Sequence, residues 1–158
     1  MFRPMRRFKQ ALSAEECLEV LKEEKRGTLA LAGDDGYPYA LPINYFYEEA
    51  SGRIYFHGAG EGHKIDAIRR CDKVSFNVHD AGVKLEGDWA YTVRSVTVFG
   101  RLHILEDWDR AMALLRQIGL KYYPSVEEVD QVMERAASRV TMLELVPEHI
   151  TGKRVHEK

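Results

Sequence analysis

The sequence predicts a mainly β fold, in which a small antiparallel barrel is surrounded by helices. Two observations support this prediction. Six segments are rich in β-branched and aromatic residues or alternate in hydropathy, at residues 28–32, 37–47, 53–57, 73–79, 89–105 and 139–146. Only a few segments have helical spacing, and no second strand–helix–strand unit follows the first.

The first elements are a helix and a strand. Ser13 and Glu16 form a capping box that opens a helix, which is predicted to end near Gly27. Residues 28–32 form a strand, and residues 34–36, Asp-Asp-Gly, are a hairpin turn.

The second strand is long and contains two prolines. It covers residues 37–47, with Pro38 and Pro42 inside it. Because proline has no N–H to donate to a ladder, this strand must lie at a sheet edge or contain a bulge. It leads through a turn into a central strand at residues 53–57.

The second half of the chain begins with a half-buried strand at 73–79, a polar loop at 80–87 and a long β segment at 89–105. The remaining elements are a helix at 107–120, a helix that a capping box opens at 125–137, and a last strand at 139–146, which Pro147 ends.

The stretch from Arg53 to Lys64 carries the functional prediction. A short apolar strand is followed by three alternating glycines, then a basic pair, then a helical pattern (Gly58, Gly60, Gly62, His63, Lys64). Glycines let the backbone approach a ligand, and free amides, the helix dipole and a lysine attract anions. We therefore expect this stretch to hold the phosphate of a flavin. The alternative is a flexible connection with a solvated lysine.

Two other phosphate-binding motifs fit less well. A Walker loop needs serine or threonine after its lysine, and here Ile65 follows Lys64. A dinucleotide fingerprint needs GxGxxG before a long helix, whereas this sequence has GxGxG and about two helical turns. Asp80 lies where the acidic residue of that fingerprint would fall.

Composition limits the remaining classes. The 158 residues fit a single domain, 1–158, and the net charge of −2 gives no general attraction to nucleic acid or anionic membranes. A basic N-terminal arm is interpreted as a solvated terminus, with nucleic-acid contact as the alternative (Arg3, Arg6, Arg7, Lys9).

No metal site is predicted, because neither the two cysteines, Cys17 and Cys71, nor the histidines have ligand spacing. The sequence shows no membrane-length apolar run and no signal peptide, so a cytoplasmic protein is expected.

Several segments, in this order and spacing, resemble the FMN-binding split-barrel family, the pyridoxamine 5′-phosphate oxidase-like superfamily. They are similar above all to its 5-nitroimidazole-resistance (Nim-type) branch. The segments are GTLA (27–30), YPYALP (37–42), IYFH (54–57), GHK (62–64), VSFNV (74–78) and RSVTVFG (94–100).

The resemblance implies a six-stranded antiparallel split β-barrel with flanking helices and a homodimer that holds FMN between its subunits. It implies cofactor contacts from Pro42, Ile43, Asn44, Tyr45, Phe56, His57, Gly58, His63, Lys64, Arg94 and Ser95. Lys153, like Arg94, is a candidate donor near the flavin ring. Trp89, Tyr91 or the tail could reach the partner's cofactor.

His57 is the candidate catalytic residue, because it ends a strand beside the expected flavin edge and could donate or relay a proton. The expected function is an FMN-dependent reductase of small acceptors such as nitroaromatic compounds, with electrons from NAD(P)H. FAD or F420 in place of FMN stays open. The alternative function is a non-catalytic flavin- or haem-binding protein for storage or sensing, since no nicotinamide-binding motif is present.

Overall fold

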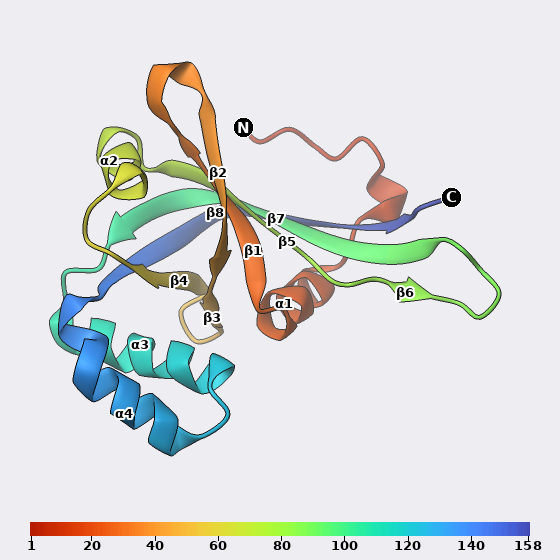
Figure 1. Cartoon of the computed structure of the whole chain (residues 1–158). Coiled ribbons are helices and arrows are strands. Elements are labelled where there is room, and N and C mark those ends of the chain that lie inside the picture. The colour runs from red at the N-terminus through yellow and green to blue at the C-terminus, as the bar shows by residue number, and fades with distance from the viewer.

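One antiparallel sheet of eight strands curls into a half-barrel, and four helices lie around it in the computed structural model, which describes residues 1–158 (Figure 1). The strands are β1 (Arg26–Ala32), β2 (Pro38–Asn44), β3 (Phe46–Glu48), β4 (Arg53–Gly58), β5 (Lys73–His79), β6 (Val83–Lys84), β7 (Tyr91–Ile104) and β8 (Thr141–His156). The helices are α1 (Ala14–Glu23), α2 (His63–Arg70), α3 (Trp108–Tyr122) and α4 (Val126–Ala136). The predicted mainly β, antiparallel barrel with flanking helices is confirmed.

The sheet order is β2-β1-β5-β7-β8-β4-β3, with β6 paired to β7. The prolines of β2 therefore lie in an end strand, as predicted. None of the helices has the length and hydropathy that crossing a membrane would require.

Two strands were not expected. The predicted strand at 37–47 is divided at Tyr45 into β2 and β3, because the backbone of Tyr45 bonds to a helix instead of to a strand. Its N–H donates to the Tyr122 hydroxyl at 2.9 Å, and its carbonyl accepts from Lys121 Nζ at 3.1 Å. The predicted loop at 80–87 contains the two-residue strand β6.

The predicted end of the last strand at Pro147 is wrong. Strand β8 continues through this proline, which pairs with Gly100 just where the register shifts, so that Phe99 pairs with His149. A bulge of this kind tolerates a residue without an N–H. At Gly100 a Cβ would lie 2.3 Å from the Val146 carbonyl oxygen, so the bulge also requires glycine there.

The predicted end of the first helix is also wrong. The Ser13 capping box is present, but α1 stops at Glu23, where Glu24 turns extended, and β1 already begins at Arg26.

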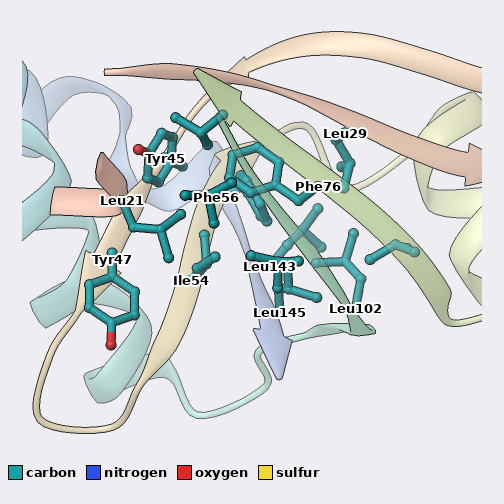
Figure 2. Packing of buried hydrophobic residues seen from close by; sticks show 14 of the residues in the cluster. Leu21, Leu29, Tyr45, Tyr47, Ile54, Phe56, Phe76, Leu102, Leu143 and Leu145 are labelled. Atoms are coloured by element: carbon teal, nitrogen blue, oxygen red, sulfur yellow. The ribbon is translucent and has the colours of Figure 1, made fainter. Parts of the chain in front are cut away.

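Strand β4 divides the hydrophobic interior into two clusters. Ile54 and Phe56 point into the barrel, where Phe56 and Phe76 pack with the aliphatic residues of Figure 2. Tyr55 points to the other face and packs against α3. His57 follows Tyr55 by two residues, so its side chain lies on the α3 side of the strand.

The barrel closes incompletely between β2 and β4. These strands approach each other, but no backbone ladder joins them, because β2 pairs only with β1. Strand β3 covers only residues 53–55 of β4, so Phe56 to Gly58 have no ladder partner on that side. Two open strand edges thus border one gap, and they leave backbone donors and acceptors free to bind a ligand.

Candidate functional site

A polar cleft lies at the gap between β2 and β4. A hollow of about 460 Å³ is lined by Arg26, Pro42, Ile43, Asn44 and His57. A second hollow, of about 540 Å³, follows β1 and the end of β5 and shares Arg26 and Pro42 with the first. The two hollows adjoin each other at these shared residues, and we refer to them together as the cleft.

The loop between β4 and α2 brings together groups that favour an anion, and we refer to it as the candidate anion site. Gly62 is the N-cap of α2 with φ of 106°, and no side chain caps the helix, so its first backbone amides are free. Lys64 lies in the first turn, where burial lowers the pKa of its ammonium group and no carboxylate offsets this shift. Free amides, the helix dipole and a half-buried unpaired cation all favour a negatively charged ligand.

Gly58 provides the space for this ammonium group. A Cβ at position 58 would lie 2.9 Å from Lys64 Nζ, so the lysine packs directly against the glycine backbone. The predicted phosphate-binding glycines and lysine therefore lie together. Because Gly58 follows His57, the candidate anion site also adjoins the cleft.

His57 lies at the junction of the cleft and the candidate anion site. Its pKa is lowered from the usual 6.5 first by burial and second by the nearby charge of Lys64. The imidazole is therefore neutral at pH 7, and it can accept a hydrogen bond or, once protonated, donate a proton.

Three predicted residues lie next to the site but face elsewhere. The His63 ring stacks on Tyr39, with centroids 4.0 Å apart, and its Nε2 lies 3.6 Å from Asp34 Oδ2. The side chains of Phe56 and Tyr45 are fully buried in the barrel. The backbone of Tyr45 is also occupied, because its N–H and its carbonyl bond to residues of α3.

Arg94, Ser95 and Lys153 lie on β7 and β8 and line none of the hollows beside His57. The Arg94 guanidinium group donates to Asp80 at 2.9 Å, and two glutamates of α1 also bind it (Glu19, Glu23). Three carboxylates thus already surround this arginine. Ser95 pairs with Lys153 in the ladder between β7 and β8.

Arg26 lines both halves of the cleft and was not predicted. Its Nε donates to Asn44 Oδ1 at 3.3 Å, across the β1–β2 ladder. Only the strand register reveals this pairing, because the two residues lie far apart in the sequence. The apolar residues of α3 and α4 that lie beyond His57 were also missed as a possible site.

Comparisons with known proteins agree with this fold. The family model described as pyridoxamine 5′-phosphate oxidase matches residues 13–154. A FAD-binding protein from Mesorhizobium loti is similar in structure, with 27% identity, a TM-score of 0.67, and coverage of 92% of this chain and 97% of that chain. A proposed 5-nitroimidazole antibiotic resistance protein from Bacteroides thetaiotaomicron has 19% identity, a TM-score of 0.74, and coverage of 92% and 87%.

A FAD-binding protein from Mycobacterium smegmatis has 21% identity, a TM-score of 0.60, and coverage of 93% of this chain and 98% of its own. No curated protein matches the sequence.

Proposed function

Because the chain belongs to the pyridoxamine 5′-phosphate oxidase family, whose model matches residues 13–154, we propose that it is a flavin-dependent reductase. It binds FMN in the cleft between β2 and β4 and reduces small acceptors, nitroaromatic compounds in particular, with electrons from NAD(P)H. The observation that carries this proposal is the unpaired, half-buried Lys64 beside the free amides of α2, packed against Gly58 next to the cleft residue His57.

The residues of the cleft fit a flavin mononucleotide. The phosphate dianion matches Lys64 and the α2 amides. The edge of β2 at Pro42 to Asn44 offers backbone groups to the polar edge of a planar ring system, and Arg26 offers positive charge beside it. The similar FAD-binding protein from Mesorhizobium loti supports a flavin ligand.

His57 would handle the proton in this reaction. When bound, a flavin would supply the two electrons for the acceptor, which it would receive as hydride from NAD(P)H. A nitro group that takes up two electrons and two protons becomes a nitroso group and water, and one of the protons comes from solvent. The imidazole at the junction of the cleft can supply or relay a proton to the oxygen on which negative charge develops.

His57→Gln is expected to change the pH profile of acceptor reduction. Only protonated His57 can donate, and burial keeps its pKa below 6.5. In the unmodified protein, the rate of acceptor reduction should therefore rise as the pH falls through a value below 6.5. This rise on the acid side of the pH profile, the acid limb, should be absent in the variant. Steady-state rates of acceptor reduction between pH 5 and 8, at saturating FMN, measure this pH profile.

His103→Gln is the matched control, because His103 is exposed on β7, lines neither hollow of the cleft and should leave the profile unchanged. A His57→Gln protein that keeps both the full rate and the acid limb contradicts the proposed proton transfer.

We also propose a homodimer with the flavin between the subunits. A row of small side chains crosses the outer face of five strands, because Thr28 pairs with Pro42 and Asn77, and Thr97 pairs with Asn77 and Thr151. Such a face allows a second sheet to approach closely. Sedimentation should give twice the chain mass of 18.2 kDa, and Thr97→Arg should give monomers.

The absorbance of the purified protein and its reduction in the stopped-flow spectrometer test the proposed function. We expect bound flavin that NADH or NADPH bleaches and that a nitroaromatic compound then reoxidises. Bound flavin that neither nucleotide reduces indicates a storage or sensor protein instead. Protein that neither contains nor binds flavin contradicts the proposal.

A further inference from the structure

An apolar pocket lies next to the cleft, on the far side of His57. It measures about 160 Å³ and lies between α3 and α4. Its walls include Leu115 and Ile118 of α3 and Val132, Met133 and Ala136 of α4. His57 is the one residue that lines both this pocket and the hollow along β2.

The position of the pocket follows from the alternation of β4. Tyr55 fills the space under α3 together with Met142, the residue that pairs with His57 in the ladder. The imidazole of His57 comes next on this face of the strand. It is exposed to solvent, and the apolar packing under α3 ends beside it. An apolar pocket is therefore present next to the imidazole of His57.

We propose that this pocket is the acceptor subsite and that it takes a single aromatic ring. This inference rests on the proposed function, because it identifies the class of acceptor that the flavin site would reduce. An apolar cavity of about 150 Å³ is large enough to hold benzene. The ring of the acceptor occupies the pocket, while its nitro group remains at the mouth, beside His57 and the open edge of β2.

The walls also determine which acceptors are excluded. Neither a lysine nor an arginine lines the pocket, so a phosphorylated acceptor would lose its hydration without gaining a cation. The volume of about 160 Å³ is close to that of a cavity known to hold benzene, so a single ring matches it. The structure therefore favours neutral, monocyclic nitroaromatic compounds over phosphorylated or polycyclic ones.

Ala136→Leu tests the subsite with nitrobenzene as the probe. The larger side chain fills the pocket, so the dissociation constant of nitrobenzene, from saturation-transfer NMR or calorimetry, should rise about tenfold or more. FMN affinity should stay unchanged, because Ala136 does not line the cleft. Ala113→Leu is the matched control, since Ala113 is exposed on α3 and lies outside the pocket.

A second variant keeps the test decisive if Ala136→Leu misfolds. Met133→Ala enlarges the pocket, and it should raise the affinity for 1-nitronaphthalene relative to nitrobenzene several-fold. Nitrobenzene binding that neither variant changes overturns the subsite. Nitrobenzene binding that responds to both variants, in a protein that does not bind flavin, preserves the subsite and overturns the proposed function.

Discussion

Lys64→Ala is expected to weaken FMN binding by about ten- to a hundredfold and to leave riboflavin binding unchanged. A hydrogen bond to a charged group contributes about 1.5–3 kcal/mol, and each 1.4 kcal/mol is a factor of ten in affinity. Riboflavin has the same ring system but no phosphate. If Lys64 binds the phosphate, the substitution should therefore lower the affinity for FMN and leave the affinity for riboflavin unchanged.

Quenching of flavin fluorescence during titration measures both dissociation constants. Lys22→Ala is the control, because it removes an exposed lysine of α1 that pairs only with Glu49. Gly58→Ala should reproduce part of the Lys64 effect, because the new Cβ would lie 2.9 Å from Nζ and displace the flexible end of the side chain. An equal loss for FMN and riboflavin would show that Lys64 maintains the cleft and does not bind the phosphate.

The parts of the site that are contiguous in the sequence could be predicted. The strand, the glycines and Lys64 lie within twelve residues, and their order alone indicates an anion site. The end position of β2 followed from its prolines, because proline removes a ladder donor wherever it lies. Local chemistry sufficed for these predictions.

The parts that depend on distant segments could not be predicted. Tyr45 leaves the strand because Tyr122, 77 residues later, bonds to its backbone. The cleft forms because barrel curvature brings β2 towards β4, and the apolar pocket forms because α3 and α4 lie over His57. Arg94 is surrounded by carboxylates from α1 and the β5–β7 connection, which strand patterning does not reveal.

Phe76→Ala is expected to cost about 3–5 kcal/mol of the free energy of unfolding, the usual range for a buried phenylalanine. Phe76 is fully buried in the middle of the barrel (Figure 2). Its ring packs edge-to-face with Tyr45 at 5.0 Å and with Phe56 at 5.1 Å. One side chain of β5 thus packs against β4 and against the residue that links β2 to β3. Small domains are stable by only about 5–15 kcal/mol, so a large share of the total would be lost.

The same substitution should also weaken flavin binding indirectly. A Cβ at Gly27 would lie 2.4 Å from the Phe76 ring, so this ring supports the backbone next to Arg26, which lines the cleft. Urea denaturation of the flavin-free protein measures the stability loss, and FMN titration measures the second effect. Phe8→Ala is the control, because Phe8 is 71% exposed and should change stability by less than about 0.5 kcal/mol. Equal losses for Phe76→Ala and Phe8→Ala would show that the barrel interior does not depend on this aromatic group.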